Sequence, residues 1–183
     1  MKSSELERDT NKGTKPADIA IIGMAGRFPG AADYNEFWEK LKASESGISV
    51  VPEDRWDWET YWGDPQTEKN KSNSKWGGFL KNVDSFDSDF FGFAAREVER
   101  MDPQQRIMLE LTWGCFEDAG IRPSEVAGEA VGVFLGVFNF DYKELQEKER
   151  HLSIEAHHST GTASAIIANR ISYYFDLRGP SIP

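Results

Sequence analysis

The single cysteine, Cys115, is the side chain of this sequence with the greatest intrinsic capacity for nucleophilic chemistry. A reactive thiol needs a neighbouring base or positive charge that lowers its pKa. Cys115 instead sits close to Trp113 and Phe116 on the apolar side of a predicted helix, and no histidine is near it in sequence. We therefore interpret Cys115 as an inert core thiol. One cysteine also excludes an internal disulfide, which fits a cytosolic setting.

Two adjacent histidines, His157 and His158, are the next candidates, for metal binding or proton transfer. A metal site needs further ligands, and besides carboxylates the chain offers only His151 and Cys115. Adjacent side chains on a strand or a helix also point apart. We interpret the histidine pair as part of a loop or pocket wall.

Two other candidate motifs lack the residue spacing that a binding site requires. The segment GMAGRFPG (23–30) follows a predicted strand, but its glycines do not match the G-x-G-x-x-G of a dinucleotide loop, and Pro29 interrupts the expected helix start. We interpret it as a structural turn. No ligand spacing relates the carboxylates between positions 87 and 102, which we assign to helix caps and solvated faces: Asp87, Asp89, Glu97, Glu99 and Asp102.

The elements that would position these side chains alternate between strands and helices. The apolar runs DIAIIG (18–23) and AVGVFLGVF (130–138) predict buried strands of a mixed sheet, the second covered on both faces. A helix is expected after Asp33, a cap residue with Glu36 three positions on. Residues 44–82 hold four tryptophans and many turn formers, which predicts an irregular excursion.

The clearest helix covers residues 102–118. Asp102 is the predicted cap, Pro103 follows it, Gln105 is expected to complete a capping box, and Gly120 is placed to end the helix. The stripe of Ile107, Leu111 and Cys115 is expected to face the core.

Two more helical segments are expected further along, besides a short helix from about Ala94. Residues 141–158 are polar and helix-prone. Residues 160–177 read as one helix whose small residues let another backbone approach: Gly161, Ser164 or Ala165, Ala168 and Ser172. Alternating strands and helices predict a layered α/β domain.

Composition narrows the functional classes. The chain has 183 residues, 39% of them apolar, which is enough for one domain with a core. A net charge of −10 argues against a nucleic-acid or anionic-membrane surface. No run of about 18 apolar residues predicts a membrane span, and residues 1–17 read as a flexible polar tail or linker without a signal peptide.

Several motifs in order give residues 18–183 a resemblance to a known family. DIAIIGMAGRFPGA, MDPQQR followed by EDAG, and NRISYYFDLRGPS together resemble the N-terminal part of a beta-ketoacyl synthase (ketosynthase) domain from a modular polyketide synthase. FNFDYKEL and EAHHSTGT further resemble ketosynthases of assembly lines whose acyltransferase is a separate protein.

The resemblance implies the N-terminal half of a thiolase-like fold, layered α/β/α, and a domain that is a homodimer when complete. In the family a cysteine accepts an acyl chain from an acyl carrier protein, and two histidines assist decarboxylative condensation with a carrier-bound malonyl unit. No diffusible cofactor is implied, only the carrier's phosphopantetheine arm. The family's nucleophile motif is expected just after Pro183, so no catalytic, cofactor-binding or metal-binding residue is carried over to residues 18–183.

Two functional hypotheses follow. The chain is part of an acyltransferase, completed by the remaining half of the ketosynthase on the same or a separate chain. Alternatively, it is a nonenzymatic ketosynthase remnant that acts as a docking or dimerisation module. The resemblance favours a cytoplasmic protein with no nucleic-acid or membrane partner.

Overall fold

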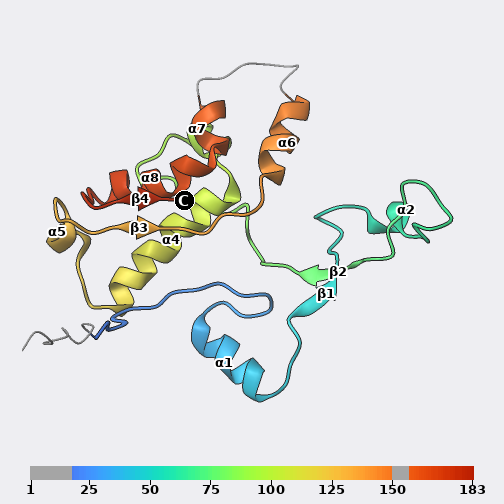
Figure 1. Ribbon diagram of the computed structural model, residues 1–183, viewed down its shortest axis with the longest axis horizontal. Helices are drawn as coiled ribbons and strands as arrows, with labels where there is room; N and C mark the ends of the chain where they lie inside the picture. The colour runs from blue at the N-terminus through green and yellow to red at the C-terminus, as the bar shows by residue number, and fades with distance from the viewer. Residues whose placement is uncertain (1–17, 150–156) are drawn as a thin grey trace, which may run out of the picture.

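Two helices packed together form the centre of the molecule. The computed structural model describes residues 18–149 and 157–183, so the predicted tail 1–17 and part of the helix-prone segment 141–158 lie outside the described residues. Helix α4 (Pro103–Asp118) packs against α8 (Ser164–Tyr174), and α8 contacts the strands β3 (Val133–Phe134) and β4 (Ser181–Ile182). Figure 1 shows this body, with the region around α2 projecting from it.

The ends of α4 follow the sequence prediction, except for Gln105. The Asp102 carboxylate accepts a hydrogen bond from the Gln104 backbone N–H at 2.8 Å, and Pro103 occupies the first turn. Gly120 has the positive φ of +66° that ends the helix. The predicted capping box is wrong, because the Gln105 side chain turns away from Asp102 and bonds to α7 (His158–Thr162).

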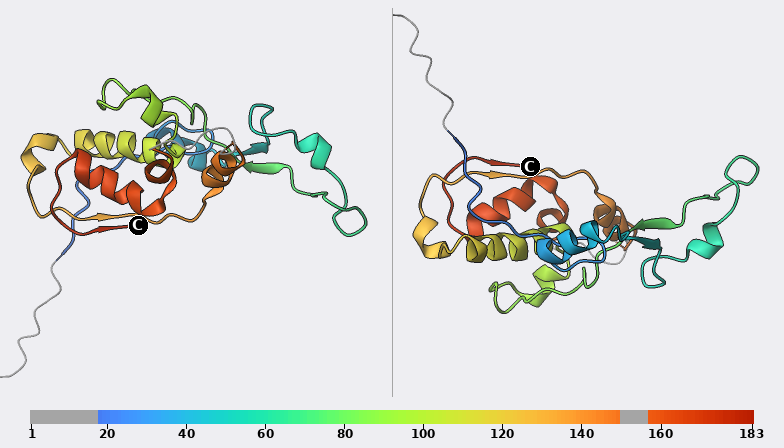
Figure 2. Two further views of the ribbon diagram at one scale, coloured as in Figure 1. Left: turned by 90° about the horizontal axis from the view of Figure 1, so that it is seen from above. Right: turned by 90° about the horizontal axis from the view of Figure 1, so that it is seen from below.

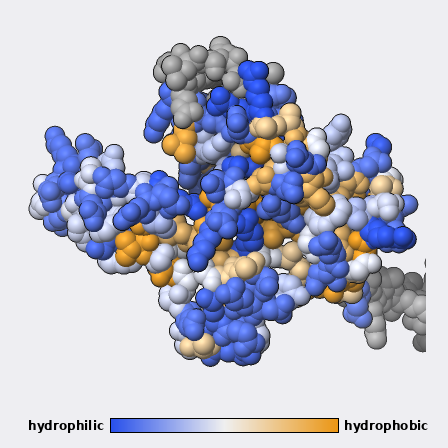
Figure 3. Space-filling view, turned by 180° about the vertical axis from the view of Figure 1, so that it is seen from behind, coloured by the Kyte–Doolittle hydropathy of each residue, from blue (hydrophilic) through white to orange (hydrophobic). Residues whose placement is uncertain are grey.

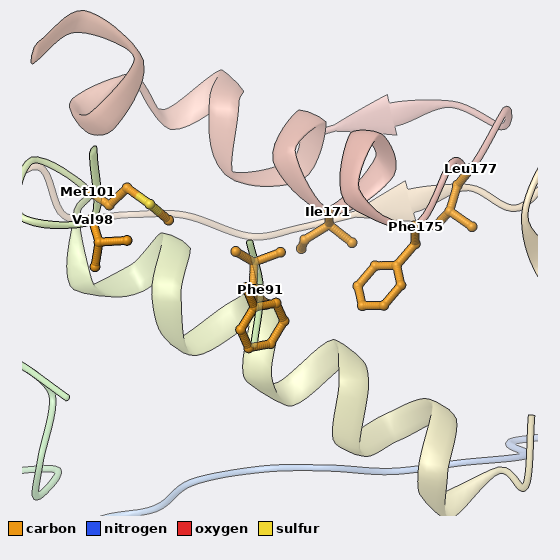
Figure 4. Close-up of a cluster of buried hydrophobic side chains, with 7 residues drawn as sticks. Phe91, Val98, Met101, Ile171, Phe175 and Leu177 are labelled. Atoms are coloured by element: carbon orange, nitrogen blue, oxygen red, sulfur yellow. The ribbon is translucent and has the colours of Figure 1, made fainter. Parts of the chain in front are cut away.

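The core lies between α4, α8 and the segment that precedes α4. Met101 and Leu109 are fully buried, and Ile171 and Phe175 from α8 and its C-cap reach toward them. Figure 4 shows Met101, Ile171 and Phe175 pointing into the space between the two helices, joined there by Phe91. Aromatic rings extend the cluster, such as Phe116, whose ring centroid is 5.2 Å from that of Phe175. Burial of this apolar area is the main stabilising term of the body.

The buried face of α4 is not the predicted stripe. The core contacts come from Leu109 together with Met108 and Trp113, whereas Leu111 is only half-buried. Leu111 and Cys115 lie on the side of α4 that meets the extended N-terminal segment, where Leu111 lines a cavity with Met24 and Ala25. That segment is a single extended chain and does not bury the helix face fully, so the prediction that Leu111 and Cys115 face the core was wrong.

Residues 130–138 form far less sheet than predicted. Only Val133 and Phe134 form β3, which pairs in parallel with β4 through Val133–Ser181 and Phe134–Ile182. Exposure alternates along the run: odd-numbered positions from 131 to 137 turn inward, whereas the even-numbered ones turn outward. Phe138 is 91% exposed, so the expected cover on the second face is absent among the described residues.

The run DIAIIG is not a strand in this structure. Residues 18–23 are extended but pair with no described strand, and Ile19 is 95% exposed. A strand is stable only when a neighbour satisfies its backbone N–H and C=O groups. Gly23 ends the run against α4, where a Cβ would come within 2.5 Å of the Cys115 carbonyl oxygen.

The predicted helix over residues 160–177 is two helices, α7 and α8. Ala163 between them has extended backbone angles, with φ −76° and ψ 125°. The Gly161 carbonyl accepts hydrogen bonds from the Asp102 backbone N–H at 2.9 Å and the Gln105 side chain at 2.8 Å. Because α4 takes this acceptor, the carbonyl does not serve the next helical turn and the helix is interrupted.

The small-residue prediction holds at Gly161 and Ala168. A Cβ at Gly161 would overlap the carbonyl of Arg100, so only glycine permits this approach of α7 to the start of α4. Ala168 is fully buried.

The remaining elements surround this body. α1 (Tyr34–Lys42) is capped by Asp33, whose side chain accepts from the N–H groups of Asn35 and Glu36, as predicted. The short helices α3 (Ala95–Val98), close to the predicted start, and α5 (Pro123–Val126) flank α4 in sequence, and α6 (Asp141–Glu149) precedes α7. No described helix is long and apolar enough to cross a membrane.

Residues 44–82 form the predicted irregular excursion. β1 (Ile48–Val50) pairs antiparallel with β2 (Trp76–Gly78), and the short helix α2 (Trp58–Tyr61) lies between them. The two views of Figure 2 show this region extending away from α4 and α8. Seen from behind in Figure 3, apolar side chains reach the surface in several places, including the region where the excursion joins the body.

We predict that Leu109→Ala destabilises the protein by about 2–5 kcal/mol, because it leaves a cavity in the core. Urea unfolding followed by circular dichroism measures the change. The same truncation at the half-buried Leu111 is the matched control and should cost clearly less. Equal losses would contradict the observed orientation of α4.

Candidate functional site

A buried polar junction joins the N-terminal end of α4 to α3, α7 and α8. We use "polar junction" for the side chains of Glu97, Gln105 and Arg170, the backbone N–H of Asp102 and the carbonyls of residues 160 and 161. The guanidinium of Arg170 donates to Gln105 Oε1 at 2.8 Å and to Glu97 Oε1 at 2.6 Å. These contacts link side chains 65 and 73 positions apart in the sequence, so the junction fixes the tertiary arrangement.

Every polar atom of Gln105 has a partner. Its side-chain N–H groups donate to the carbonyls of Thr160 at 3.0 Å and Gly161 at 2.8 Å, while its oxygen accepts from Arg170. The residue is 1% exposed, and an unpaired amide there would be costly. The Arg170 guanidinium also lies 5.2 Å from the centroid of the Phe93 ring, a favourable cation–π position.

The aspartates at the two ends of α4 have pKa values that are shifted in opposite directions. Burial raises the pKa of Asp102 above its ordinary value, although hydrogen bonds from Gln104 favour the carboxylate. At the other end, hydrogen bonds from the Met24 backbone N–H and the Tyr34 hydroxyl, both 2.8 Å, lower the pKa of Asp118. Asp118 thereby holds the N-terminal segment and α1 against the end of α4.

The glycine-rich segment 23–30 is a structural turn, as predicted. Phe28 and Ala31 exchange backbone hydrogen bonds of 3.0 Å, and Gly30 has a positive φ of +78°. The side chain of Arg27 donates to the carbonyl of Lys81 at 2.6 Å and lies 3.4 Å from Glu110 Oε2. These contacts tie the turn to the segment before α3.

Cys115 and His157 are not brought together, while His151 and the side chain of His158 lie outside the described part of the chain. Cys115 is half-buried near the C-terminal end of α4, whereas His157 precedes α7, which meets the N-terminal end of α4. About 12 residues of helix, roughly 18 Å, separate Cys115 from Pro103 at the start of α4. Within residues 18–149 and 157–183 no group of histidine, cysteine and carboxylate side chains could hold a metal ion.

The predicted roles hold for four of the carboxylates, because Asp102 caps α4 and three others are exposed: Asp87, Asp89 and Glu99. The prediction was wrong for Glu97, which is half-buried and is the ion-pair partner of Arg170. Sequence reasoning did not single out Gln105 and Arg170 as a pair. The available signal was that both lie in motifs of high specificity, MDPQQR and NRISYYFDLRGPS.

Comparisons with known proteins identify the family of this chain. The family model described as "Beta-ketoacyl synthase, N-terminal domain" matches residues 17–183. The chain belongs to this family. It is 57% identical over 166 residues to the polyketide synthase ThaG of Burkholderia thailandensis and 43% identical over 168 residues to PksN of Bacillus subtilis. These matches cover 90% and 92% of the chain but only 3% of either relative.

Solved ketosynthase structures share the fold. The oxazolomycin ketosynthase domain of Streptomyces albus matches with a TM-score of 0.79 and 39% identity, over 88% of this chain and 28% of that one. A cysteine-to-serine mutant of the ketosynthase from module 6 of the bacillaene synthase of Bacillus subtilis matches with a TM-score of 0.76 and 35% identity, over 90% of this chain and 26% of that one. The predicted fold class, α/β and thiolase-like, is therefore confirmed, and the chain is a ketosynthase portion that spans about a quarter of these structures.

We predict that Arg170→Met destabilises the protein by about 3–5 kcal/mol, because Glu97 and the Gln105 oxygen lose their charged donor in a buried setting. The side chain of Arg170 is 9% exposed. Arg122→Met is the control, since Arg122 forms a similar ion pair with Glu125 but is 80% exposed. Chemical denaturation should show a large loss only for Arg170→Met, and similar effects would contradict the role of the junction.

We further predict opposite pH dependences for Asp102→Asn and Asp118→Asn. The raised pKa of Asp102 means that its protonated form favours folding, and this contribution is lost as pH rises from 3.8 through the raised value. Asp102→Asn should therefore gain stability relative to the original protein over that rise. The lowered pKa of Asp118 gives a contribution that is present above 3.8 and lost as pH falls below it.

Asp118→Asn should accordingly become less stable than the original protein as pH rises toward neutrality. Free energies of unfolding measured at a series of pH values test both variants. Parallel pH profiles for the two would show that burial and hydrogen bonding do not set these pKa values.

Proposed function

We propose that this chain supplies the N-terminal portion of a ketosynthase that condenses an acyl chain with a carrier-bound malonyl unit. The observation that carries the proposal is the hydrogen bond between Arg170 and Gln105. It joins the two most specific motifs of the sequence inside a fold shared with solved ketosynthases. Both motifs thus serve one packing arrangement of α4 and α8.

The chemistry is thioester exchange. In the complete domain the nucleophilic cysteine would attack the acyl thioester on a carrier protein and release the carrier thiol. Loss of carbon dioxide from the malonyl unit would then give a carbanion that attacks the acyl-cysteine and frees its sulfur. We expect this cysteine and two assisting histidines to lie beyond Pro183, either in the same chain or in a second one. Residues 1–17 would be a linker.

Within residues 18–183, Cys115 is a poor candidate for this nucleophile. It lies in the last turns of α4 on the side of the N-terminal segment, and the described histidine, His157, lies at the other end of that helix. Activation of a thiol requires a base within hydrogen-bonding reach. The role of residues 18–183 in this proposal is therefore to hold the fold and to position the segment that continues from β4.

We propose further that the assembly line is of the kind whose acyltransferase is a separate protein. The similarity to PksN and PksL of Bacillus subtilis supports this subtype. Acyl carrier proteins, with their phosphopantetheine arms, are the expected partners, and a homodimer is the expected state of the complete cytoplasmic domain.

A nonenzymatic docking or dimerisation module is the second candidate. The outward face of the 130–138 segment favours it, because Phe134 and Phe138 are exposed there. The enzyme hypothesis explains the same face as surface that the rest of the domain covers. Acyl transfer by the completed domain separates the two hypotheses.

We predict that a complete ketosynthase domain containing this sequence takes up an acyl group from an N-acetylcysteamine thioester, whereas the 183-residue chain alone does not. Intact-protein and peptide mass spectrometry locate the adduct. The Cys115→Ala variant of the complete domain should still take up the acyl group, because Cys115 is not the proposed nucleophile. A stable adduct on Cys115 would overturn its assignment, and an unreactive complete domain would favour the docking module.

A further inference from the structure

Residues 51–76 of the excursion pack against one another rather than against the body of the molecule. We call this segment "the flap". Its base is fixed by the β1–β2 ladder, by the Val51 N–H bonded to the Lys75 carbonyl at 3.0 Å, and by Arg55, which donates to the Leu80 carbonyl at 2.5 Å. Beyond that base the flap extends away from α4 and α8 in both views of Figure 2.

The flap has little apolar core to hold it closed. Val51, at its base, is its buried residue, and the other described positions from 52 to 76 are half-buried or exposed. Two limbs, 58–63 and 71–76, are tied near the tip by backbone hydrogen bonds from Gly63 to Ser72 and from Ser72 to Tyr61. A few exposed hydrogen bonds hold a segment only weakly against opening.

Three tryptophans surround the ammonium group of Lys75. Its Nζ atom lies 4.5 Å from the ring centroids of Trp58 and Trp62 and 5.4 Å from that of Trp76. The rings stand edge to face, with Trp58 and Trp62 at 88° and Trp62 and Trp76 at 89°. We call these three rings "the tryptophan cage". Tryptophan is the strongest aromatic partner for a cation, and rings on several sides are the arrangement used to bind ammonium ligands.

The cage joins the two limbs. Trp58 is the first residue of α2 and Trp62 is its C-cap, whereas Lys75 and Trp76 belong to the limb that returns to the body. All three rings contact the ammonium group of Lys75. Removal of its charge would therefore abolish the cation–π contacts of both limbs at the same time. Lys75 differs in this from the nearby Lys71, which donates to the Thr60 carbonyl and contacts no ring.

We propose that the positive charge of Lys75 is a latch that keeps the flap closed, and that neutralising this one charge opens the limbs and exposes the tryptophan cage. Transfer of an acetyl group from an acetyl thioester to the Lys75 amine, with release of the thiol and a proton, removes the charge and would have this effect. The inference rests on the flap alone and is independent of the proposed function of the chain.

Hydrogen exchange of the full chain tests the latch at the amides of Gly63 and Ser72, which bond across the limbs. Lys75→Met keeps a long side chain but removes the charge, and it should accelerate exchange at both amides by about tenfold. Iodide quenching of tryptophan fluorescence should increase in the same variant. Exchange in the middle of α4 should stay unchanged, which shows that the body remains folded.

Two further variants make the outcome decisive. Lys69→Met removes an equal charge from an exposed position at the tip and should leave exchange as it was. Lys75→Arg keeps a cation that binds aromatic faces and should restore most of the protection. The latch is wrong if Lys75→Met exchanges as slowly as the original chain, if Lys69→Met accelerates exchange equally, or if Lys75→Arg exchanges as fast as Lys75→Met.

Discussion

Arg170 places a charged guanidinium inside the molecule, and a buried charge is tolerated only when its donors are matched. Glu97 and Gln105 supply the acceptors, and Gln105 in turn satisfies carbonyls at the end of α7. Each of these partners comes from a different helix. A shift of any one helix would leave a polar group without its partner, so the polar junction specifies a single packing of α3, α4, α7 and α8. The apolar contacts of Leu109 and Phe175 then stabilise the arrangement that the junction selects.

Local signals in the sequence predicted the start of α1 and both ends of α4 well. Asp33, Asp102 and Gly120 act through groups within a few residues of themselves, and all three have the predicted roles. Gln105 shows where such reasoning stops. Its position suits a capping box, but the carbonyls of residues 160 and 161 compete for its amide across more than 50 positions of sequence. Only the tertiary structure decides that competition.

The sheet predictions failed for a related reason. Apolar runs such as DIAIIG indicate that a segment suits burial, but a strand also requires a neighbour for its backbone groups. Among the described residues β3 has β4 as its partner over two positions, and residues 18–23 have none. The candidate site was predictable only in part. The core position expected for Cys115 was wrong, because this residue is half-buried and lies outside the core cluster. The pairing of Gln105 with Arg170 became visible only when two distant motifs were seen in contact.

The long sequence separation between α4 and α8 bears on how the chain folds during its synthesis. Gln105 and Arg170 are 65 positions apart, and a ribosome adding about 5–20 residues per second would need about 3–13 s to make the second after the first. Over that interval α4 has left the ribosome or is leaving it, while the helix that covers Leu109 does not yet exist. The nascent chain must keep this amphipathic helix out of wrong contacts until α8 arrives. Non-local closure of this kind is slow, and it makes the first half of the chain a natural client for chaperones.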